Sequence, residues 1–246
     1  MQIWDIVSSL PSQWKTIADW LVTQNNPPKS YSLFPFNSEA ELLVFKKDFQ
    51  KALGISLGKY VRLRRVDYLL HQINEKFKQA LSANYIETPL GEMLAIFSEK
   101  GLCLLEFCDR KMLESELLAL QKNLKANFIF QTTEQSIQLT QELSEYFAGE
   151  RKNFSIPLDI IGTEFQKSVW QALLNIPYGS TSSYKLQAES MGKLSAIRAI
   201  AAANGRNQIS IIIPCHRVIG SDGDLVGYGG GVDRKRALLK LEKTFN

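Results

Sequence analysis

The chain has 246 residues, of which 45% are hydrophobic and 22% charged, and its formal net charge is +4. This composition is typical of a globular protein and excludes a disordered chain and a collagen-like repeat. No segment approaches the roughly 18 uninterrupted apolar residues of a membrane span, and Met1–Asp5 lacks the basic leader of a secretory signal. We therefore expect a cytoplasmic protein that does not associate with membranes.

The cysteines and histidines are too few for a metal centre. Three cysteines cannot all pair, and the chain has only two histidines, His71 and His216. A zinc site of cysteine and histidine needs three or four ligands at workable spacing, and none is apparent, so we expect no metal and no cofactor. Cys103 and Cys108 lie in an apolar run that predicts a buried strand, and we interpret both as small core residues.

Residues 1–80 show helical spacing between polar breaks. The apolar positions of Trp14–Leu21 predict one helix. A second helical pattern covers Glu39–Leu53, Gly54 stops it, and Ser56 can cap a third helix. The sequence therefore predicts an all-α region.

Residues 81–157 change to strand patterns. Short apolar runs alternate with turns rich in proline and glycine, which predicts an antiparallel meander. Two helices with a short strand between them are expected to follow, and Gly149 closes the second helix. The predicted strands and helices cover, in chain order, residues 85–88, 93–97, 101–108, 111–123, 127–130 and 134–148.

Residues 158–246 are predicted to be helical with one exception. Two short helices joined by a glycine-containing turn, the second covering Ala196–Asn204, form a helix-turn-helix pattern. The exception is the β-branched run Ser210–Pro214, which predicts a short buried strand leading into Cys215. The residues expected to cap the three helices of this region are Thr163, Ser183 and Ser195.

The dipeptide Cys215-His216 is the clearest candidate for chemistry. A cysteine attacks as the thiolate, and a free thiol with a pKa of about 8.5 is mostly protonated at neutral pH. A neighbouring imidazole can accept that proton, directly or through one water, and then stabilises the thiolate. Adjacent residues of a regular strand point to opposite faces, so the contact needs a turn or a bridging water. On its own the dipeptide favours a plainer interpretation, a buried cysteine beside a capping histidine.

The residues around Cys215 extend this dipeptide into a longer pattern. The run from Ile211 to Ile219 closely resembles the active-site signature of the O6-alkylguanine-DNA alkyltransferases, and the resemblance covers the chain from about residue 83 onward. Motifs this numerous, in this order, are highly specific. The other segments that carry the resemblance are 162–166, 169–173, 176–179, 183–184, 196–199, 204–207, 227–231 and 234–242.

The resemblance implies an α+β fold in three parts. These would be an all-α region at residues 1–80, a small antiparallel-sheet domain of ribonuclease-H-like type at 81–157, and a helical alkyltransferase domain with a helix-turn-helix at 158–246. It also implies DNA repair by a single-turnover methylated-DNA–protein-cysteine methyltransferase. The partner would be double-stranded DNA that contains O6-alkylguanine, and we expect a monomer. The range of alkyl groups and activity on O4-alkylthymine stay open.

The same resemblance implies catalytic roles for individual residues. Cys215 would be the nucleophile and permanent alkyl acceptor, and His216 would be its base through a water. Glu242 would orient the imidazole and stabilise its cation. Asn207 would brace the loop between the helix-turn-helix and the active site.

On the DNA side the resemblance implies base flipping from the minor groove. Tyr184 would press on the phosphate 3′ of the target nucleotide, and Arg198 would fill the vacated stack and pair with the orphaned base. Extrusion is needed because a buried thiolate cannot reach O6 of a stacked guanine. Tyr228, Gly229 and Gly230 would line the pocket for the flipped base.

Residues 45–66 resemble the end of an AraC-type DNA-binding module, which precedes the alkyltransferase domain in the Ada adaptive-response proteins. Because the order of domains agrees, we interpret residues 1–80 as a degenerate relic of such a regulator, with a solvated basic helix as the plainer alternative. The second hypothesis for the whole chain is a transcription regulator whose C-terminal domain only senses damage. Promoter-specific binding in the absence of the C-terminal domain would support it.

Overall fold

The computed structural model describes Thr16 and residues 38–245. The helix predicted around Trp14–Leu21 lies outside the described residues, apart from Thr16. The chain divides into two compact units, residues 1–72 and 73–246, and each is described by itself.

In the first unit, two helices form where the sequence predicts them. These are α3 (Glu39–Leu53) and α4 (Leu57–His71). Gly54 takes a left-handed φ of 69° at the end of α3, a conformation that glycine adopts without strain. The Ser56 side chain accepts a hydrogen bond from the backbone N–H of Lys59, so the predicted cap of α4 is confirmed. The likeness of this unit to an AraC-type module stays a prediction.

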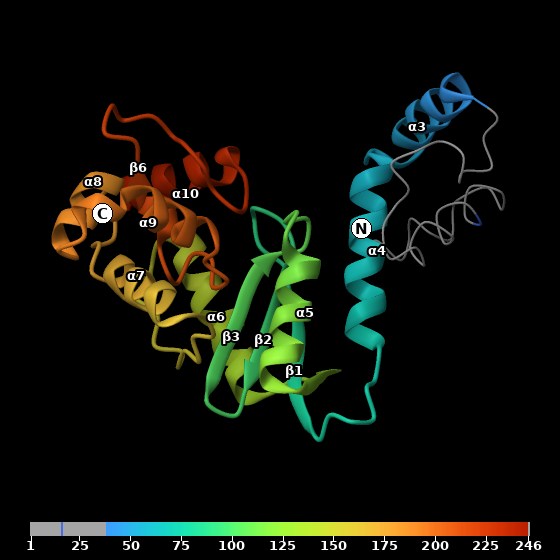
Figure 1. Cartoon of the computed structure of the whole chain (residues 1–246), viewed down its shortest axis with the longest axis horizontal. Coiled ribbons are helices and arrows are strands. Elements are labelled where there is room, and N and C mark those ends of the chain that lie inside the picture. Colours follow the sequence, from blue (N-terminus) through green and yellow to red (C-terminus); the bar gives the residue numbers. More distant parts are fainter. Residues whose placement is uncertain (1–15, 17–37, 246) are drawn as a thin grey trace. The chain divides into compact units, whose positions relative to one another are not determined.

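The second unit is built on a four-stranded sheet in the order β3-β2-β1-β4 (Figure 1). The three strands of the predicted meander pair antiparallel, which confirms this part of the prediction. The fourth strand instead pairs parallel with β1, so the sheet is mixed and not wholly antiparallel. Helix α5 (Leu113–Leu124) connects β3 to β4. A strand that pairs parallel requires a crossover connection of this kind. The strands are β1 (Gln79–Ile86), β2 (Met93–Ser98), β3 (Gly101–Phe107) and β4 (Ala126–Phe130).

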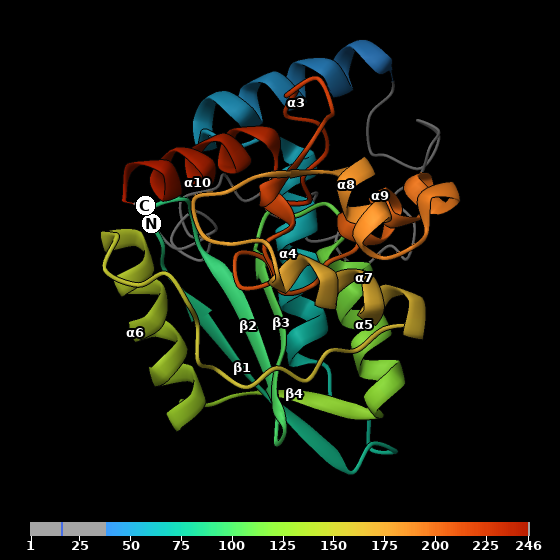
Figure 2. The same cartoon turned by 90° about the vertical axis from the view of Figure 1, so that its left-hand side faces the viewer.

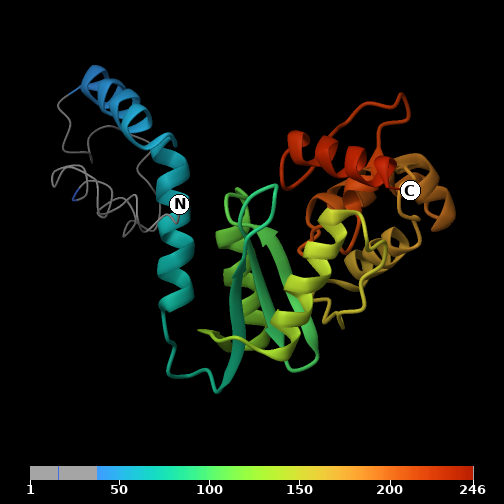
Figure 3. The same cartoon turned by 180° about the vertical axis from the view of Figure 1, so that it is seen from behind.

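Helices cover both faces of this sheet. Helix α5 (Leu113–Leu124) lies on one face and α6 (Glu134–Ala148) on the other, as Figures 2 and 3 show from the side and from behind. Both faces of β2 are therefore buried, and Met93–Phe97 is apolar at every position. Gly149 ends α6 with a φ of 80°, as predicted.

The remaining elements are helical and carry most of the predicted caps. Thr163 forms a capping box with Gln166, and Ser183 accepts from the N–H of Leu186, so two of the three predicted caps are confirmed. The third was wrong, because Ser195 lies inside a short 3-10 turn and the helix after it has no side-chain cap. The elements are α7 (Glu164–Leu174), β5 (Ser182–Ser183), α8 (Tyr184–Ser190), η2 (Leu194–Ala196), α9 (Ile197–Gly205), η3 (Cys215–Arg217), β6 (Val218–Ile219) and α10 (Val232–Thr244).

The run Ser210–Pro214 is buried but is not the strand that the sequence predicts. It forms turns, in which the N–H of Ile213 donates to the carbonyl of Ile209 at 3.0 Å. Ile211 takes a φ of 73°, which is a strained value for a β-branched residue. The apolar side chains of this run correctly predict that it is buried. They do not determine its backbone conformation, because a segment enclosed in the core can be buried without being extended.

The edge of the sheet joins the helical part. Strand β3 forms two isolated parallel bridges to that part. One joins Leu102 to Leu158, before α7, and the other joins Leu105 to Ile209, after α9. Apolar residues of the sheet and of the helices share one core. Residues 73–246 therefore form one unit, and the predicted domain division between residues 157 and 158 stays a prediction.

Candidate active site

Cys215 and His216 lie in the 3-10 turn η3, directly after the buried turns. A turn of this kind removes the difficulty that a regular strand would pose for a cysteine–histidine pair. The Cys215 side chain is 8% exposed and His216 is fully buried. The thiol is thus placed just below the surface, with the imidazole inside.

Asn207 holds the turns before Cys215. Its Nδ2 donates to the carbonyl of Ile213 at 2.8 Å and lies 3.2 Å from Sγ of Cys215. Its Oδ1 accepts from the N–H of Ile209 at 3.0 Å. The buried amide of Asn207 thus contacts both the turns between Ile209 and Ile213 and the sulfur of Cys215. The bracing role that the resemblance implies for Asn207 stays a prediction.

His216 and Glu242 form a buried pair. Nε2 of His216 lies 2.8 Å from Oε1 of Glu242, and both side chains are fully buried. A carboxylate only accepts, so Nε2 carries the proton in this contact and Nδ1 is the basic nitrogen of the neutral ring. Nδ1 is buried and has no hydrogen-bond partner among the described residues. The ring is thus oriented by one nitrogen and available at the other.

Glu242 gathers further donors that the sequence did not single out. Arg217 donates to it from Nε at 2.9 Å and from Nη2 at 3.0 Å, and the hydroxyl of Tyr146, from α6, donates at 2.8 Å. The N–H of Gly179 adds a fourth group. Burial alone would raise the pKa of Glu242, but His216 and Arg217 outweigh it and lower that pKa to about 2. Arg217 adjoins the dipeptide and could have been suspected, whereas nothing in the local sequence marks Tyr146.

Several groups act on the Cys215 thiol in opposite directions. Burial raises its pKa to about 11, the hydrogen bond from Asn207 lowers it, and the charge of Glu106 raises it again. The charges of Arg110 and Lys235 lower it. Burial also lowers the pKa of His216, against the opposing effect of Glu242. In the resting chain the geometry therefore favours a neutral thiol beside a neutral imidazole.

The glycine loop lies against the same centre. The ring of Tyr228 stands 6.4 Å from that of His216, edge on. A Cβ at Gly229 would overlap the guanidinium of Arg110, and one at Gly230 would come within 2.7 Å of the Tyr228 ring. Close packing therefore favours glycine at both positions.

The helix-turn-helix presents an exposed surface at the start of α9. Arg198, the second residue of α9, is exposed together with the short side chains of Ala199 and Ala202. Tyr184 opens α8, and its hydroxyl donates to the carbonyl of Val226 at 3.4 Å. Among the described residues, no hydrogen bond joins Arg198 or Tyr184 to Cys215.

Buried polar contacts fix the position of α9. Asn204 donates to Oε1 of Gln187, on α8, at 2.7 Å. Trp170, on α7, donates to the carbonyl of Ala203 at 2.8 Å. Both contacts hold the inner side of α9, so its outer side is presented on a rigid support.

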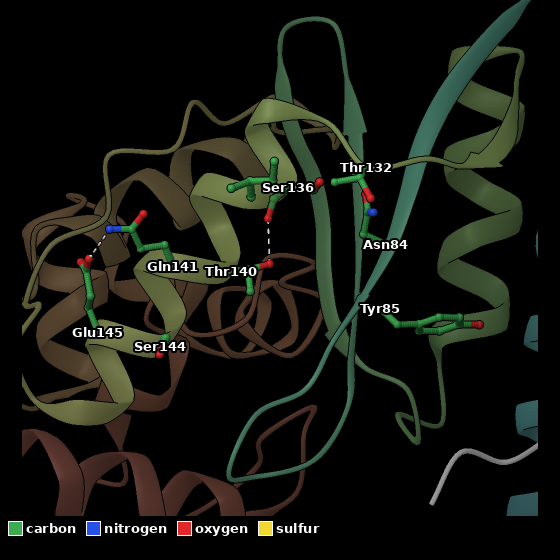
Figure 4. A pocket seen from close by; sticks show the side chains of 9 residues that line it. Asn84, Tyr85, Thr132, Ser136, Thr140, Gln141, Ser144 and Glu145 are labelled. Carbon is green, nitrogen blue, oxygen red and sulfur yellow. Dashed lines mark hydrogen bonds between the residues drawn. The ribbon is translucent and has the colours of Figure 1, made fainter. Parts of the chain in front are cut away.

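A separate pocket of about 510 Å³ lies between β1 and α6 (Figure 4). Its polar groups are used locally: Thr140 donates to the carbonyl of Ser136 at 2.8 Å, and Gln141 donates to Glu145 at 2.8 Å. None of the residues discussed around Cys215 lines it. Within residues 38–245, no group of three or more His, Cys, Asp or Glu side chains is placed to hold a metal ion. No helix in the described part of the chain is long and apolar enough to cross a membrane.

The chain is similar to known proteins over most of the second unit. Residues 81–160 match the family model of the 6-O-methylguanine DNA methyltransferase ribonuclease-like domain, and residues 164–244 match that of the DNA-binding domain. A methylated-DNA–protein-cysteine methyltransferase of Mycobacterium leprae is 58% identical over 106 residues, which are 43% of this chain and 64% of that protein. The match thus spans less than two thirds of this relative.

Other relatives are covered almost completely. The protein of the same name from Methanosarcina barkeri is 46% identical over 65% of this chain and 95% of its own length. The crystal structure of Mycobacterium tuberculosis O6-methylguanine methyltransferase is 39% identical and has a TM-score of 0.58, covering 68% of this chain and 94% of that one. A structure of the M. tuberculosis protein in complex with DNA has a TM-score of 0.57, at 39% identity and the same coverage. The chain belongs to the 6-O-methylguanine DNA methyltransferase family.

Proposed function

We propose that this chain repairs DNA by transferring the alkyl group of O6-alkylguanine to Cys215, stoichiometrically and irreversibly. The observation that carries the proposal is the arrangement in η3: His216 is held by Glu242 through Nε2, and its buried Nδ1 has no partner among the described residues. Membership of the family supports the same reaction, as do the names of its relatives.

In the proposed reaction, the thiol proton of Cys215 passes through one water to Nδ1 of His216. The imidazolium is stabilised by Glu242, whose low pKa keeps its carboxylate charged. The thiolate attacks the alkyl carbon, so that a C–S bond forms while the C–O6 bond breaks and its electron pair stays with guanine. The proton then returns from His216 through solvent to the base. A thioether is a poor leaving group, and the product chain is therefore spent after one transfer.

The DNA side of the proposal uses the exposed face of α9. Small residues allow its backbone to approach the minor groove, where readout is degenerate and suits a protein that examines every sequence. Arg198 would replace the extruded nucleotide in the stack, and Tyr184 would press on the adjacent phosphate. Tyr228, Gly229 and Gly230 would line the pocket for the flipped base. The solved DNA complex of a relative supports DNA as the partner.

The test is transfer of a labelled methyl group from duplex DNA to Cys215→Ala. We expect no transfer but nearly unchanged DNA binding, because the proposed DNA contacts lie on α8 and α9. The matched control is Cys108→Ala, which removes a buried thiol of the sheet part and should still accept the methyl group. Transfer to the Cys215→Ala chain would refute the proposed function.

A further inference from the structure

Three charged side chains lie buried beside the candidate active site. Glu106 is the last residue but one of β3 and is fully buried. Arg110 follows that strand and Glu116 lies on α5, and each of these two residues is 5% exposed. The Arg110 guanidinium donates to Glu116 from Nε at 3.0 Å and from Nη2 at 2.7 Å. Its Nη1 lies 3.1 Å from Oε1 of Glu106. We call these residues the Arg110 cluster.

The Arg110 cluster is a costly arrangement. Buried charges lose their hydration, and an ion pair recovers that loss only when every group is well paired. Here one guanidinium faces two carboxylates, and Oε2 of Glu106 is buried with no hydrogen-bond partner in the described part of the chain. Burial raises the pKa of Glu106 to about 7, against the opposing charge of Arg110. Buried charges with shifted pKa values gather at functional sites, so the Arg110 cluster is a candidate for a functional role.

The cluster reaches three segments that surround Cys215. Oε1 of Glu106 accepts from the hydroxyl of Ser210 at 2.8 Å, in the turns before the nucleophile. Nη2 of Arg110 donates at 3.0 Å to the carbonyl of Gly205, the last residue of α9. The guanidinium also occupies the space that a Cβ at Gly229 would fill. One cluster anchored on the sheet thus contacts the DNA-facing helix, the active-site turns and the glycine loop.

The two inner charges also act on the sulfur, with opposite signs. Glu106 raises the pKa of the Cys215 thiol, and Arg110 lowers it. The other groups that interact with the thiol are Asn207 from the segment before it, Lys235 from α10, Tyr184 from α8 and Tyr228 from the glycine loop, and His216 is its neighbour in η3.

We propose that Glu106 and Arg110 are positioning residues for the alkyl transfer, which hold the end of α9, the turns before Cys215 and the glycine loop in place around the thiol. The proposal rests on the function proposed above. Arg110 acts mainly through position, because its planar guanidinium holds the carbonyl of Gly205 and also packs against the glycine loop at Gly229. Glu106 acts through position and charge, because it fixes Ser210 and stands close enough to influence the sulfur.

Two conservative variants of the full chain separate position from charge. Arg110→Lys keeps the charge but loses the planar fork, so transfer should be slower at every pH with an unshifted pH profile. We expect a loss of roughly tenfold or more, as misplacement of reacting groups produces. Glu106→Gln keeps an acceptor for Ser210 but removes the negative charge. Its pH–rate profile should therefore move to lower pH, by up to about one unit.

The measurement is the rate of benzyl transfer from free O6-benzylguanine between pH 5 and 9, with melting temperatures recorded alongside. The matched control is Arg151→Lys, which changes an arginine that pairs with Glu145 of α6. Its transfer rate and its pH–rate profile should equal those of the wild type. Wild-type rates and profiles in both cluster variants, with or without a lower melting temperature, would overturn the proposal. A wild-type chain that takes up no benzyl group would instead refute the proposed function and this inference with it.

Discussion

At the scale of single residues, the candidate site depends on how Glu242 is bound. Four donors surround its carboxylate, and they come from η3, from α6 and from the turn at Gly179. A carboxylate with so many donors is held in one position, and its lowered pKa keeps it ionised. It therefore fixes the proton of His216 on Nε2 and leaves Nδ1 as the basic nitrogen.

The first prediction concerns the rate of transfer by Glu242→Gln. The neutral amide no longer raises the pKa of His216, so the imidazole becomes a weaker base and the apparent pKa of the Cys215 thiol rises. Transfer at neutral pH should fall by roughly tenfold or more, and the pH–rate profile should move to higher pH. Single-turnover rates with O6-benzylguanine across the pH range provide the measurement. An unchanged rate and profile would show that the assigned network is wrong.

The second prediction concerns stability in acid. The pKa of Glu242 is about 2 in the folded chain, against 4.5 for an ordinary glutamate, so its stabilising effect is fully present above pH 4.5 and is lost as the pH falls through 2. The effect is on the order of 3 kcal/mol. Wild type should therefore lose its advantage over Glu242→Gln as the pH falls from 5 to 2 in urea unfolding. A gap that stays constant over this range would contradict the lowered pKa.

At the scale of elements, helix α9 carries the proposed contacts with DNA. Its inner side is fixed by buried polar contacts to α7 and α8, and its outer side presents Arg198 among alanines. A guanidinium at this position can supply charge near phosphates and also a planar group for the base stack. These two contributions can be measured separately, because lysine supplies only the first.

The third prediction is that Arg198→Lys binds duplex DNA nearly normally but repairs it slowly. We expect a loss of roughly tenfold in duplex, since the flipped state costs a few kcal/mol to form. The defect should shrink with free O6-benzylguanine, which needs no flipping. Arg206→Lys, an exposed arginine at the end of the same helix, is the matched control and should repair at the wild-type rate. Equal losses on duplex and on free base would assign Arg198 to the active-site fold instead.

Caps and periodicity predicted most of the helices, because these signals are local. Ser56, Thr163 and Ser183 each accept a hydrogen bond from the backbone N–H three residues ahead, and the chain around them suffices to predict that contact. The turns at Ser210–Pro214 could not be predicted in this way. Their backbone is set by the Asn207 side chain and by burial between the sheet and the helices, both of which depend on the tertiary fold.

The site residues also differ in whether a local sequence pattern could predict them. Cys215 and His216 are adjacent and carry a recognisable pattern, whereas Tyr146 reaches Glu242 from a helix 96 positions away in the sequence. Glu106 lies in the apolar run that predicts a strand, and Arg110 lies in the short polar segment after it. Neither gives a local sign of approaching the thiol. Contacts between the sheet part and the helical part are therefore the component of the site that sequence patterns miss.

At the scale of the whole molecule, the hydrogen bonds described for the candidate site all join residues of the second unit. Residues 73–246 share one core, and the family models match within this range. A unit with its own core can in principle fold alone. The described part of residues 1–72 contains the capped helices α3 and α4, and their origin as a relic of a regulator stays a prediction.

The fourth prediction is that residues 73–246 alone transfer the benzyl group of free O6-benzylguanine at the rate of the full chain. A cooperative thermal transition of the shortened protein should first establish that it is folded. Folded but inactive protein would mean that residues 1–72 take part in the chemistry. Promoter-specific DNA binding by residues 1–80 alone would separately support a regulatory role.

The central claim is that Cys215 accepts one alkyl group and is then spent. The most direct measurement is intact-mass analysis of the full chain after incubation with excess duplex DNA containing O6-methylguanine, followed by peptide mapping. We predict that each protein molecule gains a single methyl group, located on Cys215, and that repair stops at one equivalent of DNA. Repeated turnover, or a methyl group on Cys103 or Cys108, would contradict the account.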